Sequence, residues 1–374
     1  MAWKVPLYKI YHDKKDLEAV ESVIERGTDW TNGLEISNLE KELATYSGRK
    51  FAVAFNNGTS ALHAMLLAFG VCRNDEVIVP SFTFISTANS VLFTGARPVF
   101  AEIERETFAL DPEYVKKKIT EKTKAIMAVH YGGCPAEKTT ELKELAERKG
   151  VLFLEDAAES IGSKLNGKMV GSFGDAGMFS FCANKVITSG EGGAIITDSE
   201  EIYNKLRLLR SHGRAETGNY FNSSQFMDYV SLGYNFRMPS VVAALALSQL
   251  KKIDRIISMR REVANQYDKA FSDKIRVPKD GDGFFNVYQM YTILLNSHAQ
   301  REGLKKHLES KGVMTKVYFD PIHHMHFYKK VLGYNIKLPA TEEISERVLT
   351  IPLFPDLPNE EIDYICNSIK EYVK

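Results

Sequence analysis

The chain has 374 residues, of which 44% are hydrophobic and 26% are charged, and its 48 basic and 48 acidic residues cancel. This length exceeds what one small core needs, so we expect a large domain and a smaller one. The balanced charge, without a basic run interleaved with aromatic side chains, argues against a nucleic-acid partner. The apolar runs are shorter than a membrane span, and the first residues lack the apolar core of a signal peptide, so we expect no membrane association.

The cysteines indicate a compartment. Cys72, Cys134, Cys182 and Cys366 are scattered and form no C-x-x-C pair. This pattern is typical of free thiols in a reducing environment, so we expect a cytoplasmic protein.

The first two thirds of the chain alternate between short β-rich runs and amphipathic stretches. The runs number seven and lie at 51–55, 76–80, 98–103, 125–130, 151–156, 178–182 and 193–197. Amphipathic stretches such as 59–70 and 139–150 separate most of them. This order predicts an α/β fold with a mostly parallel seven-stranded sheet and helices on both of its faces.

From Pro239 the pattern changes to a long helical run that ends at Phe271. The remainder mixes a strand-like run at 288–295 with helical runs at 299–310 and 359–373. We therefore predict a large domain at 1–250, which includes the N-terminal segment, and a smaller α+β domain at 251–374. The long helix near 239–271 would join them.

Ligands of an open parallel sheet collect beyond the carboxyl ends of its strands. After the first strand, the sequence "NNGTS" (56–60) opens directly into a helix. Its backbone amides and hydroxyls would suit a phosphate, although ordinary helix capping explains the same residues. After the second strand come Phe82 and Phe84. Each is either an exposed aromatic plate or a part of the core.

The fifth and sixth strands end in charged residues. Asp156 closes the fifth strand, and Glu159 follows three residues later. The sixth strand brings Ser180 and then Lys185, a single lysine that precedes a glycine-rich turn at 190–193. A lone carboxylate at a strand end is commonly a cap, so the meaning of these residues lies in their combination.

A phosphate cradle, an aromatic plate, a strand-end aspartate and a sheltered lysine together suit pyridoxal phosphate. The lysine amine bonds covalently to the cofactor aldehyde. The aspartate pairs with the pyridine nitrogen, and the aromatic ring stacks on the cofactor. Their order along the chain is far more specific than any member alone.

Several segments carry a family resemblance. They are "NGTSALHAMLLA", "DEVIVPSFTFISTANSVLFTGARPVF", "EDAAESIGS", "GSFGDAGMFSFCANKVITSGEGG", "RSHG", "GYNFRM" and "PIH". Across nearly its whole length the chain resembles the DegT-type nucleotide-sugar aminotransferases. The resemblance implies the type I pyridoxal-phosphate transferase fold and a homodimer with shared active sites.

The resemblance also implies roles for individual residues. Lys185 would be the covalent and catalytic lysine, Asp156 the partner of the pyridine nitrogen and Phe84 the stacking ring. The residues expected to hold the cofactor phosphate are Gly58, Thr59, Ser60 and Ser180, with Asn235 supplied by the other subunit.

Substrate contacts fall in the C-terminal part. The resemblance places His323 at the sugar-nucleotide pocket and Lys316 near the diphosphate, although Lys316 could equally be a solvated surface lysine. His323, His324 and His326 suggest a metal, but they lack carboxylate or cysteine ligands at a recognisable spacing. We therefore expect no metal.

The implied activity moves an amino group from L-glutamate to a nucleotide-linked keto-deoxysugar, for glycan biosynthesis. Many relatives have histidine or glutamine at the position of Glu159, where the side chain helps to hold the phenolic oxygen of the cofactor. A glutamate resembles the branch that makes perosamine, which favours a 4-keto-6-deoxy sugar. The alternative is that Glu159 caps the following turn and does not meet the cofactor.

Three other functions stay open at this point. The chain could aminate a 3-keto sugar, or it could be a non-catalytic pyridoxal-phosphate-binding regulator. It could also be a sugar dehydratase of the same fold, but those relatives have histidine in place of the lysine, so Lys185 counts against that branch. The nucleotide and the sugar stereochemistry are not determined by the sequence.

Overall fold

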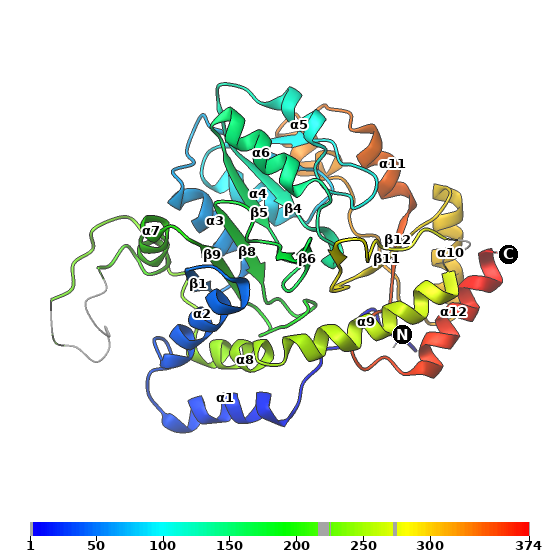
Figure 1. Cartoon of the computed structure of the whole chain (residues 1–374), viewed down its shortest axis with the longest axis horizontal. Coiled ribbons are helices and arrows are strands. Elements are labelled where there is room, and N and C mark those ends of the chain that lie inside the picture. Colours follow the sequence, from blue (N-terminus) through cyan, green and yellow to red (C-terminus); the bar gives the residue numbers. More distant parts are fainter. Residues whose placement is uncertain (1–2, 216–223, 225, 272–274, 374) are drawn as a thin grey trace.

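The computed structural model describes residues 3–215, 224, 226–271 and 275–373. A seven-stranded sheet forms its centre (Figure 1). In spatial order its strands are β1 Phe51–Phe55, β9 Gly193–Thr197, β8 Ala176–Ser180, β5 Leu152–Asp156, β4 Thr123–Val129, β2 Glu76–Pro80 and β3 Arg97–Ala101.

Five of these strands run parallel to their neighbours, from β8 through β5, β4 and β2 to β3. Strand β9 is antiparallel to both β8 and β1. Strands β1 and β8 therefore point the same way, and the carboxyl ends of β1, β2, β5 and β8 lie at one edge of the sheet. The predicted sheet is confirmed, since each of the seven predicted runs overlaps an observed strand.

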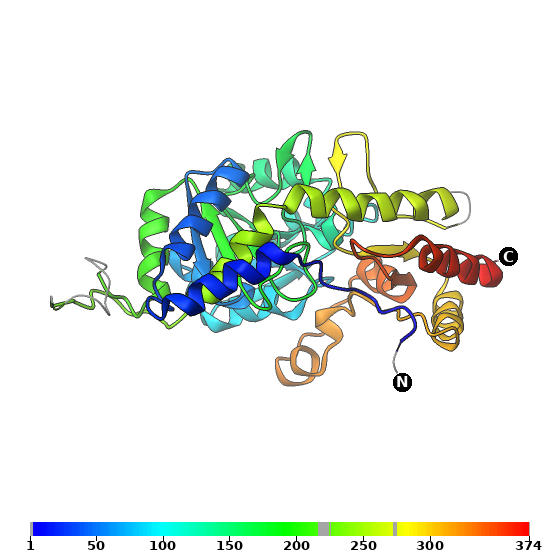
Figure 2. The ribbon, with the colours of Figure 1, turned by 90° about the horizontal axis from the view of Figure 1, so that it is seen from below.

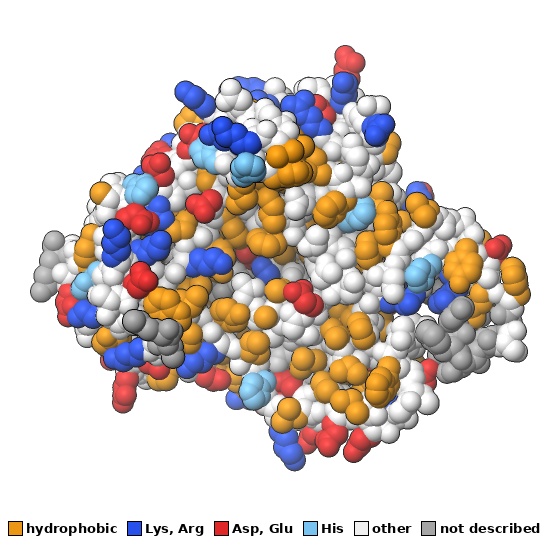
Figure 3. Space-filling view, turned by 180° about the vertical axis from the view of Figure 1, so that it is seen from behind, with side chains coloured by type: hydrophobic (Ala, Val, Ile, Leu, Met, Phe, Trp, Pro, Cys, Tyr) orange, Lys and Arg blue, Asp and Glu red, His pale blue; other side chains and the backbone are white. Residues whose placement is uncertain are grey.

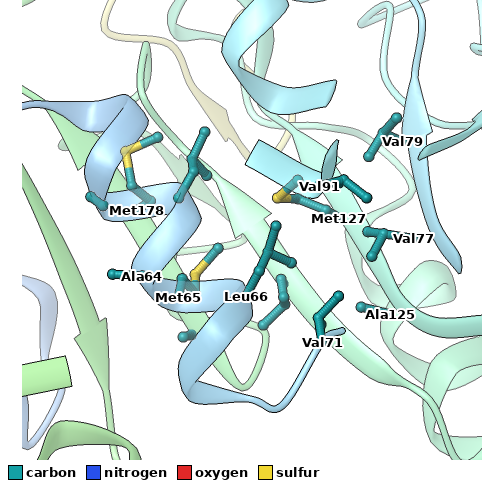
Figure 4. Close-up of a cluster of buried hydrophobic side chains, with 14 of the residues drawn as sticks. Ala64, Met65, Leu66, Val71, Val77, Val79, Val91, Ala125, Met127 and Met178 are labelled. Carbon is teal, nitrogen blue, oxygen red and sulfur yellow. The ribbon is translucent and has the colours of Figure 1, made fainter. Parts of the chain in front are cut away.

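Helices cover both faces of the sheet, as the sequence predicted. One face packs against α3 Gly58–Ala68, α4 Ile85–Phe93 and α7 Glu200–Arg210. Figure 4 shows this core: Ala64, Met65 and Leu66 of α3 lie over valine and methionine side chains of the strands. The other face packs against α2 Leu34–Ser47, α5 Pro112–Lys118, α6 Thr139–Lys149 and α8 Ser240–Leu250.

The predicted long helix is divided in two. Helix α8 ends at Leu250, and α9 runs from Ile253 to Phe271, with Lys251 and Lys252 between them. Helix α8 packs with α1 (Lys14–Arg26) and α2, whereas α9 extends toward the C-terminal elements (Figure 1). The predicted domain boundary at 250/251 coincides with the end of α8, and it stays a prediction.

The C-terminal part has its own small sheet and hydrophobic core. Strands β11 Tyr291–Leu294 and β12 Val348–Ile351 pair antiparallel. The same part of the chain contains α10 His298–Ser310, η2 Ile322–His324, η3 Phe327–Val331, α11 Pro339–Arg347 and α12 Asn359–Val373. Ile322 of η2 and Tyr328 of η3 pack into the core of the large sheet. Short elements of the large part complete the chain: η1 Tyr131–Gly133, β6 Lys164–Leu165 and β7 Lys168–Met169, with β10 Phe284–Phe285 pairing to β6.

The N-terminal segment contacts both parts of the molecule. Val5 forms a parallel bridge with Val313, and the Leu353 N–H donates to the Leu7 carbonyl. The segment then enters α1 Lys14–Arg26, where Lys252 Nζ lies 2.6 Å from an Asp13 oxygen and 2.8 Å from an Asp16 oxygen. Figure 2 shows the segment running from α1 to the C-terminal elements.

None of the helices in the described ranges combines the length and the apolar character that a membrane crossing requires.

Candidate active site

Lys185 lies in the loop after β8, with its side chain only 12% exposed. Its backbone N–H donates to the Cys182 carbonyl (3.0 Å), which closes a tight turn after the strand. Its Nζ lies 3.3 Å from Oε1 of Glu159. The lysine is thus sheltered and directed at the neighbouring strand end, as its position in the sequence suggested.

Glu159 bridges two parts of the site. One carboxylate oxygen faces Lys185, and the other accepts a hydrogen bond from the Gly132 N–H at 2.9 Å. The side chain is buried. Glu159 therefore faces Lys185 and Gly132 and does not cap the turn that follows it, which places a carboxylate next to the predicted covalent lysine.

Asp156 is the last residue of β5 and is 4% exposed. Its Oδ2 accepts from the Thr87 hydroxyl at 2.8 Å, and its Oδ1 accepts from the Ala158 N–H at 3.2 Å. Burial raises the pKa of the Asp156 carboxyl, while the two donors and the charge of Lys185 act in the opposite direction. A buried carboxylate with so few donors favours a cationic partner.

The predicted phosphate residues gather at the start of α3. The Asn57 side chain caps this helix by accepting from the Ser60 N–H (2.8 Å), and the Thr59 hydroxyl lies 2.7 Å from the Ser86 hydroxyl. A Cβ at Gly58 would lie 3.3 Å from Ser180 Oγ. Glycine here thus lets the helix start approach Ser180, and its free amides suit an anion.

The glycine-rich turn after Lys185 packs against the same helix start. A Cβ at Gly193 would lie 2.8 Å from the backbone N and Cα of Gly58. Only glycine permits this approach of two backbones. The residues and the cradle that they form fit pyridoxal phosphate, with an anion site, an aspartate and a lysine along one edge of the sheet.

Phe84 precedes α4, and its side chain is 58% exposed. Its ring centroid lies 6.4 Å from that of Phe319, so the C-terminal part approaches it. Phe82, in contrast, is fully buried among Phe108, Tyr131 and Phe319. Of the two candidate plates, only Phe84 has a face available for stacking.

The remaining predicted residues lie farther out. Asn235 is exposed and bridges Ser211, on a segment whose Phe236 carbonyl accepts from the Asn56 N–H at 2.9 Å. Lys316 is also exposed, and its Nζ lies 4.6 Å from the ring centroid of Tyr318. The proposed contacts of Asn235 and Lys316 stay predictions.

His323 is buried, and both of its ring nitrogens have partners. Nδ1 lies 2.7 Å from Ser81 Oγ, and Nε2 lies 3.2 Å from Oε1 of Glu342. Burial lowers the pKa of His323. The predicted contact of this histidine with substrate is untested, and the ring as placed links β2 to α11.

The histidine cluster includes a carboxylate that the sequence did not reveal. Possible ligand atoms of His323, His324 and Glu342 lie within 4.8 Å of one another. Both ring nitrogens of His323 already have hydrogen-bond partners in this cluster. The expectation that the chain binds no metal stays a prediction.

Two residues of the site were missed from the sequence. Thr87 bonds to Asp156 from the first turn of α4, and no local pattern indicated this contact. Burial and the nearby Glu159 carboxylate raise the pKa of Tyr318, while Lys185 opposes them, so Tyr318 belongs to the surroundings of the lysine. Nothing in its local sequence indicated this position.

Comparison with known proteins identifies the family. The model of the DegT/DnrJ/EryC1/StrS aminotransferase family matches residues 11–370. The chain belongs to this family. It is therefore an aminotransferase, and the family's dependence on pyridoxal phosphate confirms the cofactor that the residues predicted.

Named relatives agree over the full length. The chain is 37% identical to GDP-perosamine synthase of Escherichia coli O157:H7, covering 98% of each protein. Helicobacter pylori PseC, an aminotransferase involved in the biosynthesis of pseudoaminic acid, has a TM-score of 0.92 at 30% identity, covering 100% of this chain and 99% of that one. The putative sugar aminotransferase Spr1654 from Streptococcus pneumoniae, in its PLP form, has a TM-score of 0.92 at 26% identity, covering 99% of this chain and 98% of that one. The predicted type I fold is confirmed.

Proposed function

We propose that this aminotransferase moves an amino group from L-glutamate to a nucleotide-linked 4-keto-6-deoxy sugar for glycan biosynthesis. The observation that carries the proposal is the buried contact of Lys185 with Glu159 beside Asp156. The 37% identity to a GDP-perosamine synthase over almost the whole chain supports amination at carbon 4.

Each side chain has a task that follows from its place. Pyridoxal phosphate, when bound, supplies an aldehyde that carries the amino group and a ring that stabilises negative charge. Lys185 Nζ is the group that bonds to the cofactor and, once released, takes and returns a proton as a general base. Glu159 holds Nζ in position, and Asp156 offers a carboxylate to the pyridine nitrogen.

The phosphate would lie at the start of α3. Gly58 and Thr59 supply amides there, and Thr59 and Ser60 supply hydroxyls, since the Ser60 N–H is engaged by the Asn57 cap. Ser180 contributes a hydroxyl from the neighbouring strand end. Phe84 would cover one face of the cofactor ring. Lys316 would meet the diphosphate of the substrate, and its Nζ lies 4.6 Å from the ring centroid of Tyr318.

We infer that the active unit is a homodimer in which Asn235 serves the phosphate of the partner's site. An exposed asparagine and the hydrophobic side chains that gather in the middle of one face support this inference (Figure 3). The free cysteines support a cytoplasmic location.

Mixing two inactive chains tests the shared site. Under the proposal, a heterodimer of Lys185→Ala and Asn235→Ala chains regenerates one intact site. Each heterodimer should therefore have about half the activity of a wild-type dimer. Verified heterodimers without activity would contradict the role of Asn235.

The activity is tested by incubating the holoenzyme with ¹⁵N-glutamate and 4-keto-6-deoxy sugars linked to different nucleotides. The expected product is a ¹⁵N-amino sugar nucleotide, seen by mass spectrometry, and NMR of the product identifies the aminated carbon. Transfer to a 3-keto sugar alone would overturn the carbon 4 assignment.

Borohydride reduction of the holoenzyme should leave a pyridoxyl adduct on Lys185, and the absence of this adduct would overturn the role of that lysine.

A further inference from the structure

The Asp156 carboxylate has a second layer of support that the proposed roles do not include. Thr83 and Thr87 lie four residues apart, on either side of the Phe84 cap of α4. Thr83 lies just before the cap and Thr87 lies in the first turn of the helix. Thr83 is 2% exposed and Thr87 is 1% exposed, so water does not compete for their hydroxyls.

The direction of the hydrogen bonds follows from chemistry. An ionised carboxylate only accepts, so the Thr87 hydroxyl donates its single hydrogen to Asp156 Oδ2, at 2.8 Å. The Thr83 and Thr87 hydroxyl oxygens lie 2.9 Å apart. Because the Thr87 hydrogen is already used, Thr83 must donate to Thr87. The two hydroxyls form a chain whose dipoles both point toward Asp156.

Such a chain strengthens each of its bonds in a dry environment, because each hydroxyl polarises the next. It fixes Oδ2 and leaves Oδ1 with the Ala158 N–H as its donor (3.2 Å) among the described residues. We propose that Thr83 and Thr87 hold the Asp156 carboxylate ionised and oriented for the pyridine nitrogen, which makes Thr87 a positioning residue. This inference rests on the proposed role of Asp156.

The charged groups around Asp156 are few. Lys185 approaches from the loop after β8 and favours the carboxylate, and Glu159 from the loop after β5 opposes it. At the end of β4, the His130 ring bonds to Glu155 on the other face of the strand. Thr87 acts in the same direction as Lys185, so its removal should favour protonation of Asp156.

The test compares Thr87→Val, Thr87→Ser and Thr83→Val in the full-length holoenzyme. The measurement is the dissociation constant of pyridoxal phosphate by equilibrium dialysis, near pH 6 and near pH 8. Thr87→Val should weaken binding by roughly tenfold or more. The loss should be larger at the lower pH, where a less supported Asp156 is protonated. Thr87→Ser should restore the affinity, and Thr83→Val should show a smaller loss in the same direction.

Thr197→Val is the matched control. Its hydroxyl is equally buried and donates to the Asp175 carbonyl at 2.9 Å. It lies at the end of β9 away from Ser180. This substitution should leave cofactor affinity and its pH dependence unchanged.

The possible outcomes separate cleanly. If Thr87→Val binds the cofactor like Thr197→Val at both pH values, the proposal is wrong. If Thr87→Val does not fold, an unchanged affinity of Thr83→Val for pyridoxal phosphate is enough to overturn the proposed chain of hydrogen bonds. The activity assay of the wild type is a separate test. If the wild type is inactive on the proposed substrates but the threonine variants lose cofactor affinity as expected, the proposed function is contradicted and this inference is not.

Discussion

Glu155 and Asp156 are adjacent at the end of β5, and both are almost completely buried. Successive side chains of a strand point to opposite faces, so the two carboxylates meet different surroundings. Glu155 accepts from the N–H groups of Gly171, Phe173 and Gly174 at 2.6–2.7 Å. Its fourth donor is His130 Nε2 at 2.9 Å.

Among the described residues, Asp156 accepts from two donors, the Thr87 hydroxyl and the Ala158 N–H. The two carboxylates differ in the number of hydrogen-bond donors around them, and this difference matches different roles. Glu155 has all of its acceptor capacity engaged and holds two loops at the sheet edge. Asp156 can still accept a hydrogen bond from a cationic partner. The free energy that it costs to bury the Asp156 charge can therefore be offset by the pyridine nitrogen of the cofactor. Four predictions test this contrast.

The largest effect on stability is expected for Glu155→Gln. The amide nitrogen would face a backbone N–H in a site that has only donors, so the free energy of unfolding should fall by about 3–5 kcal/mol. Urea unfolding of wild type and variant measures the change. A loss below about 1 kcal/mol would show that Glu155 is not the anchor of these loops.

Asp156→Asn should have the opposite profile. The shape and one acceptor oxygen remain, so the free energy of unfolding of the apoenzyme should change by less than about 1 kcal/mol. The turnover number should fall roughly 10²–10³-fold, because the site loses the charge that meets the pyridine nitrogen. Steady-state kinetics and urea unfolding on the same preparations measure the turnover number and the free energy of unfolding. A loss of stability well above about 1 kcal/mol, or an unchanged turnover number, would contradict the role given to Asp156.

The pH dependence sharpens the same contrast. Burial raises the pKa of folded Asp156 above its unfolded value, so the folded apoenzyme binds the proton more tightly. The stability linked to this proton is present below the unfolded pKa and is lost as pH rises through the folded pKa. Relative to Asp156→Asn, the wild-type apoenzyme should therefore lose stability as pH rises from about 4. The raised pKa would be contradicted if the wild type gained stability relative to Asp156→Asn over this pH range, or if the difference in free energy of unfolding did not depend on pH.

The smallest effect is expected for Glu159→Gln. A glutamine keeps an acceptor for the Gly132 N–H and loses only the charge beside Lys185, so turnover should change less than about tenfold. The pH midpoint of the cofactor absorbance change should move, because the negative charge 3.3 Å from Lys185 Nζ has been removed. An unchanged midpoint together with unchanged turnover would remove Glu159 from the mechanism and weaken the carbon 4 assignment.

The sequence was most informative where function depends on local order along the chain. Asp156 ends one strand and Lys185 follows the next, so the strand pattern alone placed both at one edge of the sheet. The partners Thr87 and Glu342 were not predictable, because their contacts join residues 69 and 19 positions apart. These contacts are set by how separate elements pack, which periodicity does not encode.

The division of the long helix has a similar origin. Its residues continue a helical pattern through Lys251 and Lys252. In the structure, the Lys252 amine contacts Asp13 and Asp16 of the N-terminal segment. A tertiary contact more than two hundred residues away in sequence thus accompanies the break, and no local signal could report it.

The N-terminal segment gives the molecule a mechanical link that bypasses α9. One end of the segment is fastened by Asp13 and Asp16 to Lys252, and the other exchanges hydrogen bonds with Gly312 and Met314. Two residues beyond Met314 the chain reaches Lys316, and then Tyr318. A cut in this segment would therefore release the stretch that carries Lys316, the proposed diphosphate contact, while the residues proposed to hold the cofactor stayed in place.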